Sequence, residues 1–292
     1  MQSDMTDDAT TPFGLITGKA RLAGVLGWPV SHSRSPRLHG TWLRRHGIDG
    51  AYLPLPVAPE QFEAALRGLV ALGFRGANVT IPHKEAAFRL CDAVDDAARR
   101  MGAVNTLVFE EGRILGSNTD GYGFLQSIAE QAPGWAATDG PAVLLGAGGA
   151  ARAIGSALLD AGCPALTLVN RNVARAEALA KALGGPVSVA ATPPLAGAAL
   201  LVNATSLGMV GQPPLAIDLA PLPGHAVVAD AVYVPLETPL LAAARARGLR
   251  AVDGLGMLLH QARPGFARWF GTMPEVDTAL REVVAADIPR TA

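Results

Sequence analysis

The sequence has few cysteines, few aromatic residues and no cluster of like charges. Two cysteines, Cys91 and Cys163, stand far apart among 292 residues, and aromatic residues make up 5%. Neither cysteine has the spacing of a metal ligand, so we expect reduced core thiols in a cytoplasmic protein, and no metal site. The net charge of -1, without a run of lysine or arginine, excludes the basic surface typical of nucleic-acid-binding proteins.

A long uninterrupted apolar run is also missing. Residues 184–217 contain no charged side chain, but they are interrupted at Pro186, Pro193, Pro194, Asn203, Pro213 and Pro214. We therefore expect buried strands and loops there, and no membrane span. Near the N-terminus, acidic residues stand where a secretory signal carries basic ones, which favours a short disordered lead at Asp4, Asp7 and Asp8.

The chain does have a core-forming composition and an alternation of strand and helix patterns. Hydrophobic residues make up 50% and charged residues 17% of a chain long enough for two domains. In the first half we expect strands at 21–27, 51–55, 76–80, 103–109 and 113–116, and helices at 36–45, 59–72 and 84–92. After residue 141 we expect strands at 142–145, 165–170, 199–203 and 226–231, and helices at 150–161 and 174–183.

These patterns predict two α/β domains with an active-site cleft between them. Residues 1–120 would form a substrate-binding domain with a largely parallel sheet, and residues 121–254 a Rossmann-like dinucleotide-binding domain. The tail, residues 255–292, is mostly helical by pattern and has no strand of its own, so it needs a sheet to cover. We expect it to return to the first domain and complete it.

Three predicted helix starts in the first domain carry polar residues. Ser35 suits an N-cap and Pro36 the first helical position, so free backbone N–H groups would lie beside the hydroxyls of Ser33 and Ser35 and bind an anion. The same arrangement recurs at Thr80 and at residues 118–121. Three such starts facing one cleft would form a polar substrate site. The alternative is that each simply begins a helix.

Lys84 and Asp120 are the candidates for acid-base chemistry. Lys84 stands at a helix start, where the helix dipole disfavours a cation, and this position hints at a function. A carbonyl that is reduced needs a proton donor near its oxygen, and a lysine can serve when its surroundings lower its pKa. Asp120 would orient the ammonium and bind a substrate hydroxyl. The alternatives are a solvated surface lysine and a plain helix cap.

The glycine turn 146–151 follows a predicted strand and opens a predicted helix, as a dinucleotide-binding turn requires. The next strand ends in Asn170 and Arg171, where an NAD-specific site usually has an acid. An arginine there favours a 2′-phosphate and hence NADP, and Arg175 would be a second phosphate ligand on the same helical face. The alternative is two arginines on an exposed helix start. Tyr233 follows a strand and either lines the cofactor pocket or caps the core.

The histidines carry less information. His32, His39 and His83 fall near the first polar site but lack the spacing of a zinc motif. His260 precedes Gln261, and we interpret that pair as the polar face of a packed helix.

Taken together, the chain from Gly24 to Phe270 resembles the shikimate dehydrogenase family. The resemblance rests on seven ordered motifs: 27–36 (GWPVSHSRSP), 78–84 (NVTIPHK), 102–106 (GAVNT), 118–121 (NTDG), 146–150 (GAGGA), 203–209 (NATSLGM) and 253–258 (DGLGML). It implies NADP-dependent reversible reduction of 3-dehydroshikimate to shikimate, a step toward chorismate and the aromatic amino acids. It also implies Lys84 and Asp120 as the catalytic pair.

The resemblance assigns further residues to each ligand. The substrate contacts it implies are Ser33, Ser35, Thr80, Lys84, Asn105, Asp120, Tyr233 and Gln261, with the carboxylate on the two serines. The cofactor contacts it implies are Gly146, Ala147, Gly148, Gly149, Ala150, Ala151, Asn170, Arg171, Arg175, Met209, Val232 and Gly254, with Tyr233 at the border of the two sites. We expect a monomer or homodimer with a small-molecule substrate.

Two positions depart from the family pattern. Asn172 stands where many members have a threonine beside the 2′-phosphate, and His83 replaces an apolar residue. We expect His83 to point to solvent. Two alternative functions remain. One is a quinate-acting paralogue, which an acidic residue near Arg171 would have supported. The other is a non-catalytic sensor of NADP or shikimate, which loss of Lys84 or Asp120 would have supported.

Overall fold

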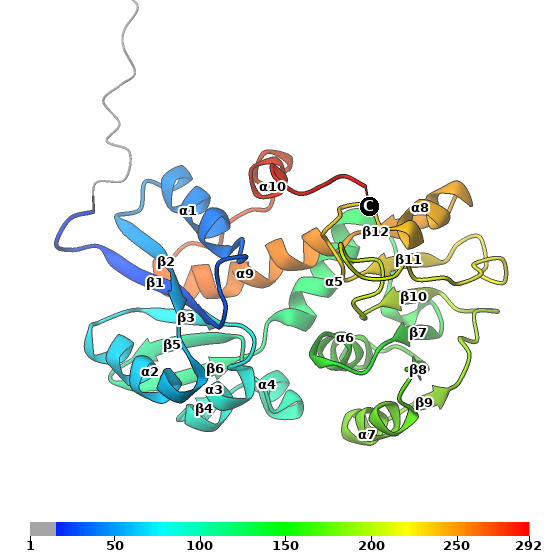
Figure 1. Cartoon of the computed structure of the whole chain (residues 1–292), viewed down its shortest axis with the longest axis horizontal. Coiled ribbons are helices and arrows are strands. Elements are labelled where there is room, and N and C mark those ends of the chain that lie inside the picture. The colour runs from blue at the N-terminus through cyan, green and yellow to red at the C-terminus, as the bar shows by residue number, and fades with distance from the viewer. Residues whose placement is uncertain (1–15, 292) are drawn as a thin grey trace, which may run out of the picture.

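The computed structural model describes residues 16–291, so the lead predicted from Asp4, Asp7 and Asp8 lies outside the described residues, as does the start of the predicted first domain. Two sheets stand side by side with helices packed around each, and the long helix α9 (Gly254–Phe270) runs between them (Figure 1). The predicted class of two α/β units is confirmed.

The first sheet has the strand order β2-β1-β3-β5-β6-β4. Its strands are β1 (Arg21–Gly27), β2 (Gly50–Pro56), β3 (Gly76–Val79), β4 (Ala93–Val94), β5 (Thr106–Glu110) and β6 (Arg113–Ser117). Its helices are α1 (Ser35–Arg45), η1 (Pro59–Gln61), α2 (Phe62–Ala71), α3 (Lys84–Leu90) and α4 (Asp96–Met101). The short β4 and α4 were absent from the sequence-based prediction.

This sheet is parallel across β2-β1-β3 and between β6 and β4, and antiparallel on both sides of β5. The antiparallel part arises from a tight turn between β5 and β6. Glu111 and Gly112 there both have positive φ, 52° and 76°, the backbone of a two-residue hairpin whose twist matches its strands. The segment that joins the carboxyl end of β3 to the start of α3 lies on the side of the first sheet that faces the second sheet.

The second sheet is parallel throughout, in the order β12-β11-β10-β7-β8-β9. Its strands are β7 (Ala142–Leu145), β8 (Leu166–Val169), β9 (Val187–Ala190), β10 (Leu200–Asn203), β11 (Val227–Asp230) and β12 (Arg250–Val252). Its helices are α5 (Asp120–Gln131), η2 (Ala137–Asp139), α6 (Gly149–Asp160), α7 (Val173–Leu183) and α8 (Pro239–Ala246). Counted from β7, this is the Rossmann order, in which a ligand binds at the carboxyl edge where the order reverses.

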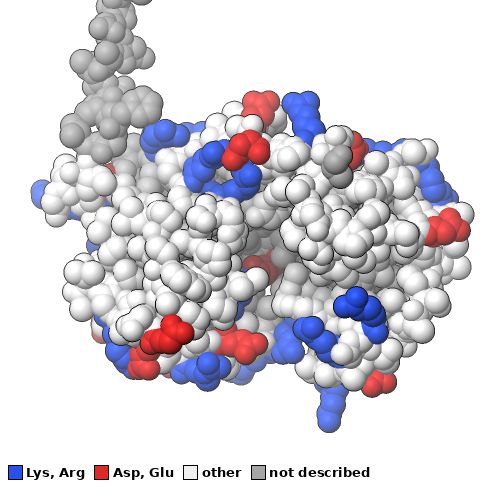
Figure 2. Space-filling model, viewed as in Figure 1, with Lys and Arg blue, Asp and Glu red and all other residues white. Residues whose placement is uncertain are grey.

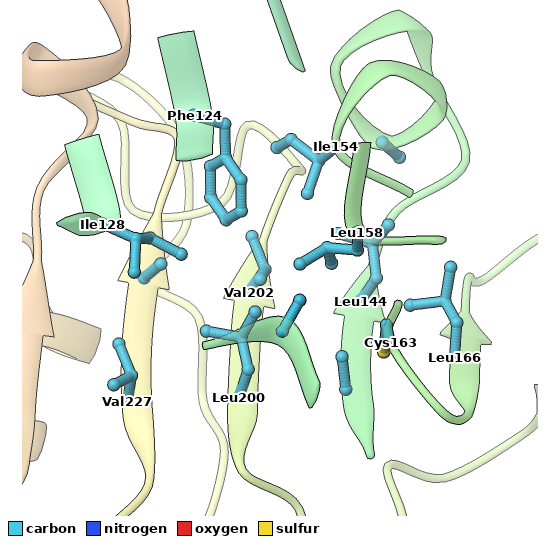
Figure 3. Close-up of a cluster of buried hydrophobic side chains, with 14 of the residues drawn as sticks. Phe124, Ile128, Leu144, Ile154, Leu158, Cys163, Leu166, Leu200, Val202 and Val227 are labelled. Atoms are coloured by element: carbon cyan, nitrogen blue, oxygen red, sulfur yellow. The ribbon is translucent and has the colours of Figure 1, made fainter. Parts of the chain in front are cut away.

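The second sheet forms around β7, β10 and β11, which are short apolar runs that are buried on both faces, as in other parallel sheets. Helices α5 and α6 cover one face (Figure 3). The side chains that meet there are Phe124, Ile128, Ile154 and Leu158 from the helices and Leu144, Leu166, Leu200, Val202 and Val227 from the strands. The uncharged segment 184–217 supplies β9 and β10, in agreement with the predicted strands and loops.

Helix α9 packs on β1, β3 and β5 of the first sheet, and α10 (Thr278–Ala285) packs on α1. Along its length α9 also lies against α5, where Gly123 permits the approach, and it begins against the loop after β11, where Gly254 does. A Cβ on Gly123 would lie 2.7 Å from both Met257 O and Gln261 Cβ, and a Cβ on Gly254 would lie 2.5 Å from Ala231 O. These contacts place one face of α9 between the two sheets.

One histidine lies in the core of the first unit. His39, on α1, is fully buried, and its ring stacks on Tyr52 with ring centroids 3.9 Å apart. Burial away from water disfavours the charged ring and lowers the pKa of His39 to about 3.

His39 should therefore make the fold sensitive to acid. The unfolded chain binds a proton on this ring below its ordinary pKa of 6.5, whereas the folded chain does not bind one until about 3. The stability that depends on the neutral ring is present above pH 6.5 and is lost as the pH falls. From pH 7 to pH 5 we expect the free energy of unfolding to fall by about 2 kcal/mol more for the native chain than for His39→Phe. Urea titrations at both pH values test this, and equal pH dependence would contradict it.

Candidate active site

A cavity of about 240 Å³ lies between the two sheets, where Figure 2 shows the surface hollowed between the two halves. All eight side chains predicted for the substrate line it, namely Ser33, Ser35, Thr80, Lys84, Asn105, Asp120, Tyr233 and Gln261. Ala150 and Gly254, predicted for the cofactor, line it as well. The structure thus brings the three polar helix starts, at α1, α3 and α5, to one cavity together with Met257, Leu258 and Gln261 of the tail.

Lys84 and Asp120 form an ion pair inside this cavity. Each is the first residue of its helix, α3 and α5, and Lys84 Nζ donates to Asp120 Oδ2 at 2.6 Å. The exposed fraction is 30% for the lysine side chain and 15% for the aspartate. Asp120 does not cap α5, since the N-cap residue is Thr119 and makes no side-chain cap bond. Lys84 is therefore paired with a carboxylate inside a cavity and is not a solvated surface lysine.

Asn105 holds the second oxygen of the carboxylate. Its Nδ2 donates to Asp120 Oδ1 at 2.7 Å. Its Oδ1 accepts from the backbone N–H of Thr119 at 3.0 Å and from the Thr106 hydroxyl at 2.9 Å. Because Asn105 is only 2% exposed, these bonds fix its amide and leave both oxygens of Asp120 engaged. The plane of the carboxylate is thus set toward Lys84.

Gln261 reaches the same group from α9. The Thr119 hydroxyl donates to the backbone oxygen of Gln261 at 2.8 Å, and Asn105 Nδ2 lies 3.4 Å from Gln261 Oε1. The tail is therefore hydrogen-bonded to the segment that carries Asp120.

Several residues that line the cavity were not assigned from the sequence, and two of them, Asn78 and Arg34, are polar and have partners elsewhere in the chain. Asn78 is 5% exposed, accepts from the Tyr52 hydroxyl at 2.6 Å and donates to the backbone oxygen of Asn105 at 3.1 Å. Arg34 pairs at 2.5 Å with Asp287, which follows α10. Both residues stand within motifs quoted above, and those motifs could have indicated a role in the site. The motifs could not indicate the partners, because these lie far along the chain.

Helix α1 begins one residue earlier than predicted. Ser35 is its first residue and Arg34 its N-cap, without a side-chain cap bond, so the expectation that Ser35 is the N-cap is wrong. The cause is local: the backbone N–H of Ser35 donates to Ser33 Oγ at 3.3 Å, and Pro36 is accommodated within the first turn. The two hydroxyls still line one cavity.

His83 does not point to solvent, so that expectation is also wrong. It is 2% exposed, its ring stacks on Phe62 with centroids 4.4 Å apart, and its Nε2 lies 2.7 Å from Val57 O. The flat imidazole ring, with Nε2 hydrogen-bonded to Val57, fills the space between α2 and α3, where an apolar residue would also fit. His260 lies on the packed helix α9, with Nε2 2.7 Å from Glu130 Oε2.

The glycine turn between β7 and α6 has the geometry of a cradle. Gly146 has φ 112°, and a Cβ there would lie 2.9 Å from Ala204 O. Gly148 and Gly149 have open space where a Cβ would stand, and α6 begins at Gly149 without a side-chain cap. The backbone N–H groups at this helix start are therefore accessible to a diphosphate, which is the arrangement a dinucleotide needs. Ala151 is buried beneath the turn.

Asn170, Arg171 and Arg175 lie beyond the end of β8, and both arginines are exposed. Asn172 caps α7, since its side chain accepts from the backbone N–H of Arg175 at 3.1 Å. Helix α7 begins at Val173, so Arg171 precedes the helix, and the expectation that both arginines share a helical face is wrong. The capped first turn carries Arg175 beside the loop that carries Arg171.

A second cavity, of about 780 Å³, shares Ala150 and Tyr233 with the first. Met209 and Val232, both predicted for the cofactor, line it. Further lining residues come from the loops after β10 and β11, namely Ala204, Thr205, Ser206, Ala231 and Val234, and from the first unit and the tail, namely Ser31, His32, Ser33, Arg34, Arg37, Ile81 and Asp287. Gly254 lines the first cavity, and the remaining predicted cofactor residues line neither of these two cavities: Gly146, Ala147, Gly148, Gly149, Ala151, Asn170, Arg171 and Arg175.

Within residues 16–291, no three or more His, Cys, Asp or Glu side chains gather into a group that could hold a metal ion. Over the same range, no helix has both the length and the apolar character needed to cross a membrane.

Comparison with known proteins assigns the chain to a family. Family models match residues 25–107 (shikimate dehydrogenase substrate binding domain), 127–203 (shikimate / quinate 5-dehydrogenase) and 254–283 (shikimate 5'-dehydrogenase C-terminal domain). A shikimate dehydrogenase (NADP(+)) of Rhodospirillum rubrum is 64% identical over 279 residues, 92% of this chain and 99% of that protein. The chain belongs to the shikimate dehydrogenase family. Its members are oxidoreductases, so the predicted family and enzyme class are confirmed.

Solved structures of the family have the same fold. Shikimate 5-dehydrogenase from Thermus thermophilus, in complex with NADP(H) and shikimate, matches with a TM-score of 0.81 at 38% identity, over 91% of this chain and 99% of that one. Quinate dehydrogenase from Corynebacterium glutamicum, in complex with NAD, matches with a TM-score of 0.82 at 32% identity, over 91% and 99%. The NADP cofactor predicted for this chain agrees with the first of these and with the curated relative.

Proposed function

We propose that this chain is an NADP-dependent shikimate dehydrogenase that reduces 3-dehydroshikimate to shikimate on the way to chorismate and the aromatic amino acids. The observation that carries the proposal is the Lys84–Asp120 ion pair of 2.6 Å inside a cavity. The cavity also carries hydroxyls and amides, beside His32 and Arg34, and these groups suit a small ring that bears hydroxyl groups and a carboxylate.

The substrate carboxylate is held by the hydroxyls of Ser33 and Ser35. Both lie at the start of α1, where backbone N–H groups without a helical partner favour an anion. Thr80, Asn105 and Gln261 bind ring hydroxyls from the remaining sides of the cavity. Three elements distant in sequence thereby fix the orientation of the ring, and orientation accounts for much of the rate gain in such reactions.

Lys84 supplies the proton to the carbonyl oxygen as that oxygen becomes a hydroxyl. Asp120 holds the ammonium at 2.6 Å, and Asn105 keeps the carboxylate in place at 2.7 Å, so the remaining N–H bonds of Lys84 are free to face the substrate. In the reverse direction Lys84 accepts the proton. When bound, NADPH supplies the hydride.

The cofactor is held by the glycine turn and the loops around it. Backbone N–H groups at the start of α6 bind the diphosphate, as the open space at Gly148 and Gly149 permits. Asn170, Arg171 and Arg175 bind the adenine ribose and its 2′-phosphate. Met209, Val232 and Gly254 face the nicotinamide half, since they line the two cavities that share Tyr233.

An assay of shikimate and quinate, each with NADP+ and with NAD+, tests the proposal through the absorbance of the reduced nicotinamide. We expect turnover with shikimate and NADP+ to exceed the other three combinations. Absence of turnover with shikimate and NADP+ would overturn the proposal. Preferential turnover of quinate would favour the paralogue, and binding of NADP+ without turnover of either acid would favour a sensor.

Ser33→Ala and Ser35→Ala should each raise the KM for shikimate about tenfold, with kcat changed less than about threefold. Carboxylate binding is shared by the ground state and the transition state, so its loss weakens binding more than it slows chemistry. Ser188→Ala, on the exposed strand β9, serves as the matched control. Steady-state kinetics measure both constants, and a fall in kcat at constant KM would count against this role.

Further expectations remain proposals. We place the enzyme in the cytoplasm as a monomer or homodimer that binds no nucleic acid. We also retain the division into a substrate domain, residues 1–120 completed by 255–292, and a cofactor domain, residues 121–254. Closure of these domains over both ligands would bring the two cavities together around the reacting atoms.

A further inference from the structure

Asp230 is a buried carboxylate to which the mechanism above gives no role. It is the last residue of β11 and is 2% exposed. Its strand neighbour in the sheet register is Asn203, the last residue of β10. The two residues therefore lie side by side at the carboxyl edge of the second sheet, where the loops that line the larger cavity begin.

Three donors converge on this carboxylate. Asp230 Oδ1 accepts from Asn203 Nδ2 at 2.9 Å and from the backbone N–H of Val232 at 3.0 Å. Asp230 Oδ2 accepts from the Thr238 hydroxyl at 2.7 Å. Thr238 in turn caps α8 by accepting from the backbone N–H of Leu241 at 3.4 Å. One side chain thus links the end of β10 to both ends of the loop between β11 and α8.

Asn203 extends the link into the neighbouring loop. Its Oδ1 accepts from the backbone N–H and the hydroxyl of Thr205, at 3.0 and 2.7 Å. Its Nδ2 also donates to Leu207 O at 3.0 Å. These bonds fix which way the Asn203 amide faces, because a flipped amide would present its NH₂ group to the donors of Thr205. The amide can reach Asp230 only as a donor, so the loop depends on an acceptor at position 230.

Both loops form the wall of the larger cavity. Residues 204–206 and Met209 come from the loop after β10, and residues 231–234 from the loop after β11. We propose that Asp230 is a positioning residue for the cofactor, which holds these two loops in the arrangement that binds the nicotinamide half of NADP. This inference rests on the proposed placement of that half in the larger cavity.

The chemistry of the site favours positioning over simple stabilisation. The partners of the carboxylate are uncharged donors, and burial raises the pKa of Asp230 to about 6. At neutral pH the carboxylate is therefore charged although burial disfavours that charge. An apolar residue of similar size would suit a sheet edge better if packing were the whole purpose. A carboxylate can accept from three donors on two loops at once, which an apolar residue cannot do.

Four variants test the proposal by calorimetric titration with NADP+ alone, by kinetics with shikimate, and by thermal unfolding. Asp230→Ala removes all three acceptor contacts. Asp230→Asn keeps an oxygen for Asn203 and Val232 and turns its NH₂ toward the Thr238 hydroxyl, which can accept. Thr238→Val removes the cap bond of α8 together with one of the three donors to Asp230, and leaves the link to Asn203. Asp95→Asn, at the N-cap of α4 in the first unit, controls for loss of a carboxylate that accepts from a backbone N–H away from both cavities.

We expect Asp230→Ala to raise the Kd for NADP+ about tenfold or more, and Asp230→Asn to recover it to within about threefold of the native chain. The KM for shikimate in every variant and the Kd of Asp95→Asn should stay within about twofold, and Thr238→Val, which removes one of the three donors, should weaken NADP+ binding less than Asp230→Ala. If Asp230→Ala is insoluble, Asp230→Ser, which keeps one hydroxyl and loses the second oxygen, takes its place with the same direction expected.

Two results would overturn the proposal: a Kd for NADP+ within about twofold of native in the alanine or serine variant, or equal weakening in Asp230→Asn and Thr238→Val in step with their loss of thermal stability. The native chain separates this test from that of the proposed function. If it binds NADP+ but does not oxidise shikimate, the reaction is wrong and the Kd values still decide the role of Asp230. If it does not bind NADP+, both proposals fall.

Discussion

Lys84→Ala should lower kcat for shikimate oxidation by about 10² to 10⁴-fold, with the KM for shikimate changed only a few-fold. The ammonium is held by Asp120 at 2.6 Å and lines the cavity, so its removal takes away the group that moves the proton. Asn105 and Gln261 remain to bind the ring, and ground-state binding is therefore largely kept. Steady-state kinetics at saturating NADP+ measure both constants.

Lys84→Arg separates proton transfer from charge. A guanidinium would keep a cation beside Asp120 but does not give up its proton at accessible pH. We expect Lys84→Arg to remain within about tenfold of Lys84→Ala. Lys181→Ala, on the exposed face of α7, is the matched control and should match the native chain. Turnover by Lys84→Ala near the native rate would remove Lys84 from the mechanism, and full activity of Lys84→Arg would show that charge alone suffices.

Arg171→Asp should lower kcat/KM for NADP+ about 100-fold and leave kcat/KM for NAD+ within about threefold. A carboxylate in place of the guanidinium loses the attraction to the 2′-phosphate and adds repulsion, whereas NAD+ lacks that phosphate. Because Arg171 is exposed, the preference of the native chain for NADP+ should also weaken as salt is raised.

Arg67→Asp is the control for this prediction, because Arg67 is also an exposed arginine and lies on α2. It should leave both cofactor constants unchanged. Kinetics with each nicotinamide cofactor at fixed shikimate provide the measurement. Equal loss of activity with NADP+ and NAD+ would mean that Arg171 acts on something other than the 2′-phosphate.

The sequence predicted best where a feature depends on neighbouring residues. The turn at Gly146 needs a backbone conformation that glycine favours, and a strand before it and a helix after it are visible as patterns. The starts of α1, α3 and α5 were likewise marked by polar residues and proline. Errors of one residue, as at Ser35, arose because the hydroxyl of Ser33 and the following proline set the first turn together.

Features that depend on distant contacts escaped prediction. From its neighbours in sequence His83 was expected to be solvent-exposed. In the structure it is covered by Phe62, at the start of α2, and by Val57, which lies before that helix. Arg171 and Arg175 were expected on one helical face from their spacing of four residues, although Arg171 precedes α7, which starts at Val173. The short strands β9 and β12 are edge elements with weak patterns, and pairing with β8 and β11 makes them strands.

By itself the sequence determined the chemistry of the site: which side chains carry hydroxyls, amides and charge, and which segments begin with them. Local backbone preferences are encoded residue by residue, so these could be found by inspection. Only the tertiary structure decided that Gln261 returns to Asn105, that Asn105 turns Asp120 toward Lys84, and that Asp230 joins two loops. Each of these depends on the close packing of elements far apart in the chain, such as α5 against α9 at Gly123, and burial then fixes which donor meets which acceptor.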